Sequence, residues 1–390
     1  MKYKTAYPNF PKEDIEEILT KISYILEGKG LLSMGDYVEE FENSFAKYLG
    51  SNSAVATNSC SSSLEISLNA LGVGYGDEVI VPAQTFIATG SAVVRTGAKP
   101  IFCEVNKNFL IDFQDIKKNI TSKTRAVIIV HFAGLIHEDI VKIRNYLNER
   151  KIFLIEDAAH VTGSALGGIK AGNFSDLSCF SFFSTKNMTT GEGGMIVSNN
   201  KGLIRRCASI RNRGIDLDSE TEKFKNIGSN NRMTEIQALL GIYQLKRIEE
   251  FNEHRNKIAN IYDEELDDLI DSNILSIHTK PSDSKSAYWK YWVSLEKGYF
   301  DSKDRLAIKK AMALASIPID WAYDPLVHLQ PVFKKMYNIN KGHLPRSEEF
   351  SSRHICLPIH TLISEKDALF IISKFKETVT KFRMKNIEIV

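Results

Sequence analysis

The residues of this sequence that could do chemistry stand at the ends of two mostly apolar runs. Ile152–Glu156 is followed by Asp157 and, three residues later, by His160, while Leu177–Phe183 leads into Lys186. Taken alone, the carboxylate would cap a loop and the lysine would be solvated. Together they suit a different chemistry. A fixed negative charge can keep a heterocyclic nitrogen protonated, and a desolvated lysine can form a Schiff base with an aldehyde.

A serine-rich segment, Thr57–Leu64, is the third candidate, because it follows a predicted strand and begins a predicted helix. Free N–H groups and hydroxyls at a helix N-terminus bind phosphate, although an isolated serine run is more often a helix cap. Gly72–Asp77 looks like a dinucleotide fingerprint, but it precedes a strand and its third glycine is misplaced, so we interpret it as a turn. A phosphate site, a carboxylate for a ring nitrogen and a lysine for an aldehyde are together what pyridoxal 5′-phosphate requires.

These groups can meet only if a sheet brings its strand ends together. From about residue 53 to residue 198, short apolar runs alternate with helical stretches such as Leu64–Leu71 and Glu138–Arg150. Continuous apolar runs are typical of strands covered by helices on both faces, which predicts an α/β fold with a mostly parallel sheet. Ligands bind at the carboxyl ends of such strands, so Asp157 and Lys186 are expected in one pocket. The predicted strands are Ser53–Thr57, Glu78–Val81, Pro100–Glu104, Ala126–His131, Ile152–Glu156, Leu177–Phe183 and Gly194–Ser198.

The C-terminal part of the sequence has a different pattern of predicted elements. A long helix is predicted from Met233 to about Leu269, because its apolar residues recur at helical spacing. We therefore expect a large domain, residues 1–250, which carries an N-terminal helical arm at Lys12–Glu27, and a smaller α+β domain, residues 251–390. Further elements are predicted at Ile274–His278, Tyr288–Leu295, Ser302–Leu314 and Ser364–Val379.

Composition excludes several classes of protein. The 390 residues include 50 Lys+Arg and 48 Asp+Glu, and this balance argues against a dedicated nucleic-acid binder. No apolar run is long enough to span a membrane and the N-terminus has no apolar signal core, so we expect a soluble cytoplasmic protein. The five cysteines are widely spaced without a CxxC pair, and the histidines lack ligand spacing; we expect reduced thiols and no metal site.

Several stretches together resemble one known family. The sequence is similar to the DegT/DnrJ/EryC1/StrS sugar aminotransferases, of the aspartate aminotransferase fold type I, over almost its whole length. The resemblance implies a pyridoxal-phosphate-dependent transaminase with a large domain and a smaller C-terminal α+β domain. The matching stretches are Gly76–Pro82 with Thr85 and Phe86, Gly97–Pro100, Glu156–His160, Cys179–Phe182, Thr185–Asn187, Gly191–Met195, then Asn230, Arg232, Met233, Glu235, Gln237 and Ala238, and finally Pro325, Leu326, His328, Leu357 and Pro358.

The resemblance also implies roles for individual residues. Lys186 would form the Schiff base and carry protons, Asp157 would pair with the pyridinium nitrogen, and His160 would lie close to the ring and its oxygen. Phe86 would stack on the ring. Asn230 would reach the cofactor of a neighbouring subunit, which implies a homodimer with shared active sites. The phosphate would be held by Ser61, Ser62 and Ser181.

The departures from the family pattern concern the substrate. Arg213 stands where a histidine is usual, and the block around Asn230 lacks the common tyrosines. If Arg213 and Arg232 face the pocket, they add planar donors for a phosphate or carboxylate; otherwise they are surface or interface residues. Trp321, Tyr323 and His328 could contact the substrate or fill the core between the domains.

The expected reaction is the transfer of an amino group from L-glutamate, with glutamine as the next choice of donor. The acceptor is expected to be a nucleotide-linked keto-sugar used for a capsule, an O-antigen or another glycan. A small phosphorylated ketose such as dihydroxyacetone phosphate is the alternative. Two other classes are a dehydratase and a non-catalytic regulator on the same cofactor. Relatives that dehydrate have histidine in place of Lys186, so this lysine favours transamination.

Overall fold

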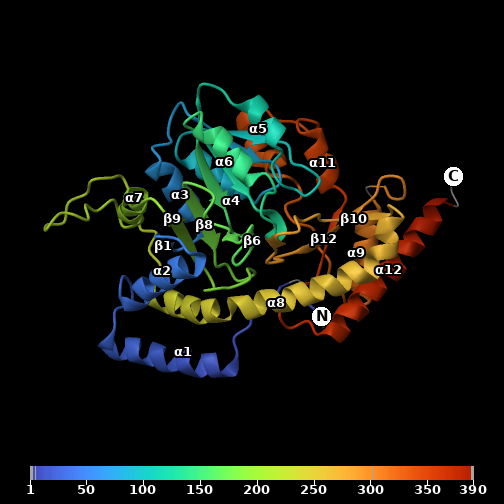
Figure 1. Ribbon diagram of the computed structural model, residues 1–390, viewed down its shortest axis with the longest axis horizontal. Coiled ribbons are helices and arrows are strands. Elements are labelled where there is room, and N and C mark those ends of the chain that lie inside the picture. Colours follow the sequence, from blue (N-terminus) through green and yellow to red (C-terminus); the bar gives the residue numbers. More distant parts are fainter. Residues whose placement is uncertain (1–2, 5, 302, 388–390) are drawn as a thin grey trace.

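A seven-stranded sheet forms the centre of the larger part of the molecule (Figure 1). The computed structural model describes residues 3–4, 6–301 and 303–387. The strand order is β1-β9-β8-β5-β4-β2-β3, and β9 alone runs antiparallel to its neighbours. These strands are β1 (Ser53–Thr57), β2 (Glu78–Pro82), β3 (Lys99–Cys103), β4 (Thr124–Val130), β5 (Phe153–Asp157), β8 (Leu177–Ser181) and β9 (Gly194–Ser198).

Helices cover both faces of this sheet because its strands are apolar on both faces. In β4, Val127 and Ile129 face one core, whereas Ile128 faces the other. The first core includes residues of α2 (Asp36–Leu49), α5 (Phe113–Asn119), α6 (Ile140–Asn148) and α8 (Glu235–Asp271). The second includes residues of α3 (Cys60–Ala70), α4 (Ile87–Arg95), α7 (Lys201–Arg211) and α10 (Pro331–Tyr337). The predicted α/β class with a mostly parallel sheet is confirmed.

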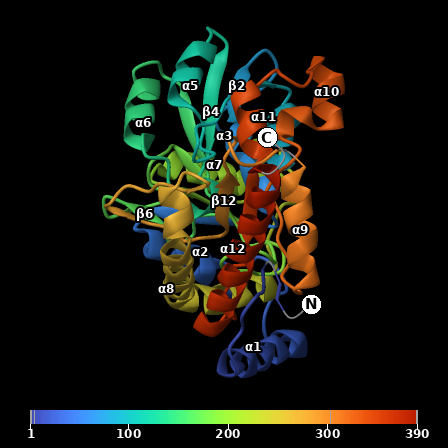
Figure 2. The same cartoon turned by 90° about the vertical axis from the view of Figure 1, so that its right-hand side faces the viewer.

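A smaller unit forms around the three-stranded antiparallel sheet β10-β12-β13. Helices α9 and α12 contact each other and pack with the second half of α8 over this sheet (Figure 2). The remaining elements are α1 (Lys12–Tyr24), a π-helical turn (Ile25–Lys29), two 3-10 turns (Phe132–Gly134 and Val327–Leu329), β6 (Ala165–Leu166), β7 (Ile169–Lys170), β10 (Leu275–Ile277), β11 (Ser284–Lys285), β12 (Tyr291–Leu295), α9 (Asp304–Leu314), α11 (Pro345–Ser351), β13 (His354–Leu357) and α12 (Glu365–Ile387).

Helix α8 connects the two units without a break. It begins with a capping box formed by Thr234 and Gln237, and it runs past residue 250, where the sequence places a boundary. Among its buried side chains, Ala238, Ile242 and Ile248 belong to the large sheet's core, and those from Ile258 onward belong to the small unit's core. Leu239 and Tyr243 pack with Ile18 of α1 instead. After α9 the chain returns from the small unit to the large one. Buried residues between Leu326 and Leu344 contribute to the core of the large sheet.

The N-terminal arm and one loop lie at the periphery. Helix α1 packs on α8, away from the sheet (Figures 1 and 2). The loop that follows α7 projects from the body of the molecule and carries the exposed side chains of Phe224 and Ile227. Within the described residues, no helix is both long enough and apolar enough to cross a membrane. All five cysteines are free.

One predicted strand begins later than expected. The sequence predicts a strand from Tyr288, but β12 begins at Tyr291. The residues before it bond to loops of the large sheet instead of to a neighbouring strand. Lys290 N–H donates to the carbonyl of Ala133, and the indole N–H of Trp289 donates to the carbonyl of Thr185. The start of the predicted helix Ser302–Leu314 lies outside the described residues.

Candidate active site

A cavity of about 410 Å³ opens where β5 and β8 end and α3 begins. This volume lies in the range of small-molecule and cofactor sites. Adjacent parallel strands bring the ends of β5 and β8 together, since Asp157 is opposite Cys179 in the sheet register. The lining residues are Ser59, Cys60, Ser61, Leu64, Thr85, Phe86, Ala88, Val130, Asp157, Ala159, His160, Ser181, Phe183, Thr185, Lys186, Glu192, Gly193, Trp289 and Tyr323.

Asp157 ends β5 with its carboxylate in the cavity. Its Oδ2 accepts a hydrogen bond from Thr89 Oγ1 at 2.9 Å, and its Oδ1 accepts one from the N–H of Ala159 at 3.3 Å. Burial raises the pKa of Asp157 above its usual value, and the bond from Thr89 and the charge of Lys186 offset this only in part. A cationic partner in the cavity would therefore be strongly favoured by this carboxylate.

Lys186 lies in the turn after β8 and points its amine into the same cavity. Its Nζ is 4.1 Å from the centroid of the Trp289 ring. Burial lowers the pKa of Lys186 to about 8, although the negative charge of Asp157 acts in the opposite direction. Burial thus makes the unprotonated amine, which is the form that attacks a carbonyl group, far more abundant at neutral pH than in an exposed lysine.

His160 lines the cavity and has one ring nitrogen without a hydrogen-bond partner within the described residues. Its Nε2 is bonded to the hydroxyl of Tyr323 at 2.8 Å, while the buried Nδ1 has no hydrogen-bond partner within the described chain. The imidazole stacks on Trp289, with ring centroids 3.8 Å apart and planes 11° from parallel. Burial, together with the charges of Lys186 and Lys290, holds the pKa of His160 well below its usual value, so the ring is neutral.

The N-terminus of α3 forms the opposite end of the cavity. Ser59 caps the helix by accepting the N–H of Ser62 at 3.2 Å. The first N–H groups of a helix have no partner in the helix and are available to an anion. Strand β9 passes close to this turn, and a Cβ on Gly194 would come within 2.5 Å of the Ser59 backbone. Ser61 and Ser181 line the cavity, whereas Ser62 does not. The Ser62 hydroxyl lies 3.0 Å from that of Ser59.

Comparison with known proteins identifies this arrangement. The sequence model of the DegT/DnrJ/EryC1/StrS aminotransferase family matches residues 12–376. The chain belongs to this family. It is a pyridoxal-phosphate-dependent transaminase, and the resemblance seen in the sequence is confirmed.

Individual relatives match along most of their length. GDP-perosamine synthase of Escherichia coli O157:H7 is 32% identical, with 97% of this chain and 99% of that protein covered. UDP-N-acetyl-3-dehydro-alpha-D-glucosamine 3-aminotransferase of Acidithiobacillus ferrooxidans is 30% identical, with coverages of 93% and 94%. Among solved structures, PseC of Helicobacter pylori, an aminotransferase involved in the biosynthesis of pseudoaminic acid, has a TM-score of 0.87 at 25% identity, with 97% of this chain and 99% of that chain covered. The expected fold type I is thereby confirmed.

The residues of this aminotransferase fit pyridoxal phosphate. The buried carboxylate of Asp157, whose pKa is raised, suits a protonated ring nitrogen. The unpartnered Nδ1 of His160 suits a ring oxygen, and the N-terminus of α3 suits the phosphate. Phe86, which precedes α4, is 55% exposed at the cavity and could cover one ring face.

Three residues predicted to contact the substrate or a neighbouring cofactor lie outside the aminotransferase's own cavity. Arg213 is exposed and forms an ion pair with Glu222 at 2.9 Å. Arg232 donates to Oδ1 of Asn212 at 2.7 Å, and the exposed Asn230 pairs with Asn212 through the backbone.

The three C-terminal candidates for substrate contact lie in different places. Tyr323 lines the cavity and bonds to His160. His328 does not line the cavity. Its ring is fully buried and bonded to Glu348 at 3.2 Å, which agrees with the alternative interpretation of His328 as a core residue. Trp321 also lies outside the cavity, where Arg305 and Lys309 approach its ring.

Sequence reasoning missed two residues that contact the functional groups. Thr89 bonds to Asp157, and its position one helical turn after Phe86 is the signal that could have found it. Trp289 contacts both Lys186 and His160 from the C-terminal half of the chain. No local pattern points to Trp289, because it stands in an apolar run that reads as an ordinary strand.

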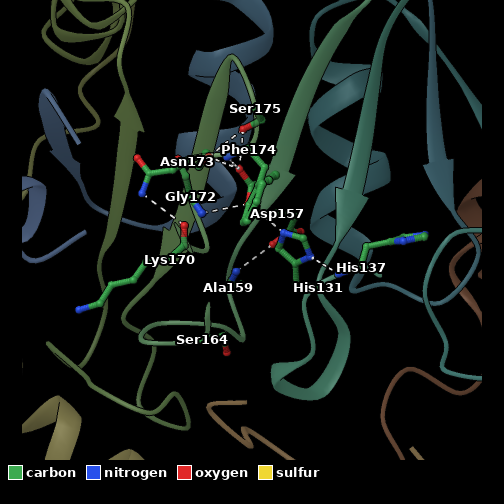
Figure 3. A network of polar contacts seen from close by, with 12 residues as sticks. His131, His137, Asp157, Ala159, Ser164, Lys170, Gly172, Asn173, Phe174 and Ser175 are labelled. Atoms are coloured by element: carbon green, nitrogen blue, oxygen red, sulfur yellow. Dashed lines mark hydrogen bonds and ion pairs between the residues drawn. The ribbon is translucent and has the colours of Figure 1, made fainter. Parts of the chain in front are cut away.

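On the opposite face of β5, the fully buried Glu156 is the centre of a second polar network. His131, Gly172, Phe174 and Ser175 of this network are labelled in Figure 3. His131 donates through Nε2 at 2.9 Å, since its Nδ1 accepts the N–H of His137. Burial alone would raise the pKa of Glu156, but the bonds from His131 and from the loop after β7 outweigh it and hold the pKa below its usual value. The other donors are the N–H groups of Gly172 and Phe174 and the hydroxyls of Ser175 and Ser178.

Proposed function

We propose that this aminotransferase moves an amino group from L-glutamate to the ketone of a nucleotide-linked sugar, with Lys186, Asp157 and His160 as its catalytic residues. The proposal is supported above all by one observation. The amine of Lys186, the carboxylate of Asp157 and the N-terminus of α3 meet at a single cavity. A sugar aminated in this way is a building block for a capsule, an O-antigen or another glycan.

Each residue has a separate task. Pyridoxal phosphate, when bound, supplies an aldehyde to which an amine can attach and a ring that accepts electrons from the adjacent carbon. Lys186 would hold the aldehyde, and when it is released its Nζ would take the proton from the α-carbon of glutamate. In the second half of the reaction the same Nζ delivers a proton to the sugar carbon that was the ketone. Asp157 keeps the ring nitrogen protonated, and the neutral His160 orients the ring through Nδ1.

The lining of the cavity favours a nucleotide-linked sugar over a small phosphorylated ketose. Lys186 is the one lysine or arginine among the described lining residues, and Glu192 adds a negative charge. Within one subunit, Arg213 and Arg232 lie outside the cavity, so neither supports the small phosphorylated ketose there. Phe86, Phe183, Trp289 and Tyr323 instead provide aromatic surface of the kind on which sugars and bases stack. Two relatives are named for GDP- and UDP-linked sugars.

A second copy of the chain would complete the site. Phe86 and Phe183 are 55% and 42% exposed at the cavity, and the loop after α7 carries the exposed Phe224 and Ile227. We therefore include in the proposal a homodimer in which Asn230 of the partner subunit reaches the cofactor. Co-refolding Lys186→Ala with Asn230→Ala subunits should restore about a quarter of wild-type activity if sites are shared across a two-fold dimer. Activity that stays at the level of the separate variants contradicts shared sites.

The function is tested with ¹⁵N-labelled L-glutamate and the protein loaded with pyridoxal phosphate. GDP-, dTDP- and UDP-linked 4-keto sugars are offered in parallel with dihydroxyacetone phosphate. We expect ¹⁵N in one amino-sugar nucleotide and 2-oxoglutarate as co-product. Lys186→Ala should abolish both, whereas Lys201→Ala, which changes an exposed lysine at the start of α7, should not. Label in the triose alone would establish the alternative acceptor, and label released without any acceptor product would contradict the reaction.

A further inference from the structure

Trp289 connects the C-terminal half of the chain to the two groups that bear the chemistry. It lies just before β12 and is 7% exposed. One indole makes three contacts: its ring is 4.1 Å from Nζ of Lys186, it stacks on His160 at 3.8 Å, and its N–H donates to the carbonyl of Thr185 at 3.0 Å. Thr185 immediately precedes Lys186. The indole is therefore hydrogen-bonded to the backbone next to the lysine whose amine it contacts.

The backbone on the other side of Lys186 is tied to the same segment. The side-chain amide of Asn187 donates to the carbonyl of Ala287 at 2.5 Å and to Oδ1 of Asn252 at 2.9 Å. Asn252 is fully buried on α8. Lys186 is therefore flanked on both sides by bonds to Ala287, Trp289 and α8, and Trp289 alone among them also contacts the lysine's amine.

We propose that Trp289 is a positioning residue that holds the free amine of Lys186 in the place from which it moves protons. The proposal rests on the function proposed above, in which Lys186 is released from the cofactor in each half-reaction. Once released, a four-carbon side chain can point in many directions, and ordering it costs conformational entropy. Once it has taken up the proton, Lys186 is an ammonium group, which the face of a tryptophan attracts, and contact with the indole gives the side chain one preferred position.

The same indole restricts His160. Its stacking fixes the plane of the imidazole, and the bond from Nε2 to Tyr323 fixes the rotation within that plane. Nδ1 is then left as the buried ring nitrogen without a hydrogen-bond partner within the described residues. Trp289 thus sets the relative position of the proton carrier and the ring-orienting histidine, although it lies more than one hundred residues away from either in the chain.

The first test removes the ring. Trp289→Leu should lower kcat about 10- to 100-fold, the cost expected when a catalytic group is misplaced by about 1 Å, with KM for the keto-sugar little changed. Trp289→Phe, which keeps a ring face, should recover most of the loss. Trp321→Leu removes a tryptophan outside the cavity and should behave as wild type. A Trp289→Leu protein as active as Trp321→Leu overturns the proposal.

A readout without turnover uses cofactor-free protein. After mixing with pyridoxal phosphate, stopped-flow absorbance reports the rate constant of covalent attachment to Lys186. We expect this rate constant to fall in Trp289→Leu and to be restored in Trp289→Phe, because attachment requires the amine to be in position. Thermal unfolding of the same samples monitors the fold. If attachment is as fast in Trp289→Leu as in wild type, Trp289 does not position the amine.

A third measurement separates action through Lys186 from a general effect on the shape of the pocket. In Lys186→Ala, a small free amine such as ethylamine replaces the lysine as proton carrier. In this rescued background Trp289→Leu should cost at least about fivefold less than in wild type, since the group it positions is absent. An equal cost in both backgrounds means that Trp289 only shapes the pocket. Full activity of Lys186→Ala without ethylamine would instead contradict the function proposed for Lys186, and is thus a distinguishable failure.

Discussion

Glu156 and Asp157 are consecutive carboxylates on one strand, and the protein uses them in opposite ways. Glu156 accepts hydrogen bonds from five groups, and its pKa lies below the usual value. Asp157 accepts two, and its pKa lies above the usual value because burial dominates. Successive side chains of a strand point to opposite faces, so one residue of difference decides which environment each carboxylate meets.

The difference shows how a buried charge is assigned to structure or to chemistry. A carboxylate whose oxygens are fully provided with donors has no remaining demand for a ligand, and it stabilises the loops that supply those donors. A buried carboxylate with few donors keeps a large electrostatic demand that a bound cation can meet. By this criterion Glu156 holds the loop after β7, whereas Asp157 remains available to a bound cation.

The largest effect should follow from neutralising the functional carboxylate. Asp157→Asn should reduce kcat by about 10²–10³-fold, the usual cost of losing one preorganised electrostatic group. Its thermal stability should not fall, because a neutral amide removes a charge that is costly to bury without a cation. Initial rates of the loaded protein and thermal unfolding of the cofactor-free protein measure the two effects. A stable variant with wild-type kcat would break the comparison.

Glu156→Gln should show the reverse pattern. It leaves donors without a charged acceptor, and we expect a loss of about 3 kcal/mol in the free energy of unfolding. Since the pKa of Glu156 is lowered in the fold, its contribution is present above the unfolded value near 4.5 and is lost as pH falls through the folded pKa. The difference in the free energy of unfolding between wild type and Glu156→Gln should therefore narrow as the pH falls below about 4.5. Denaturant unfolding at several pH values measures it, and activity per folded molecule should change far less than in Asp157→Asn.

A smaller effect is expected from the one side chain that bonds to Asp157. Thr89→Val removes the donated hydrogen bond while keeping the shape, and should lower kcat about tenfold, as for a hydrogen bond to a charged group. Thr89→Ser keeps the hydroxyl and should restore activity. The two variants separate orientation of the carboxylate from packing of α4. Thr89→Ser weakens the packing but keeps the hydrogen bond, whereas Thr89→Val keeps the packing but removes the bond.

The smallest expected effect is a shift in pH dependence. The rate of cofactor attachment to the cofactor-free protein should rise with pH and level off above about 8, because the attacking amine of Lys186 must be unprotonated. The charge of Asp157 raises this pKa, so Asp157→Asn should move the inflection to lower pH. In Glu156→Gln the inflection should stay in place. Stopped-flow absorbance across pH measures all three proteins, and an inflection that moves equally in both variants would remove the distinction.

Much of the scaffold could be predicted from local patterns. The bounds of β1 and β9 agree with the sequence prediction, and the apolar run Ala126–His131 corresponds to a strand buried on both faces. These features depend on the side-chain pattern of a few adjacent residues, which a single sequence contains. The sequence predicts that β12 begins at Tyr288, three residues too early. The residues just before Tyr291 donate hydrogen bonds to Ala133 and Thr185, which are distant in the chain and invisible to a local pattern.

The sequence by itself determined the chemical types and their order along the chain: a carboxylate after one strand, a lysine after the next, and a serine-rich helix start. Only the tertiary structure decided that Trp289 contacts Lys186, that Glu156 is occupied by five donors, and that Arg213 lies outside the cavity. The reason is physical. Strand and helix patterns are set by neighbours along the chain, whereas burial and hydrogen bonding of a side chain are set by whatever the fold brings beside it.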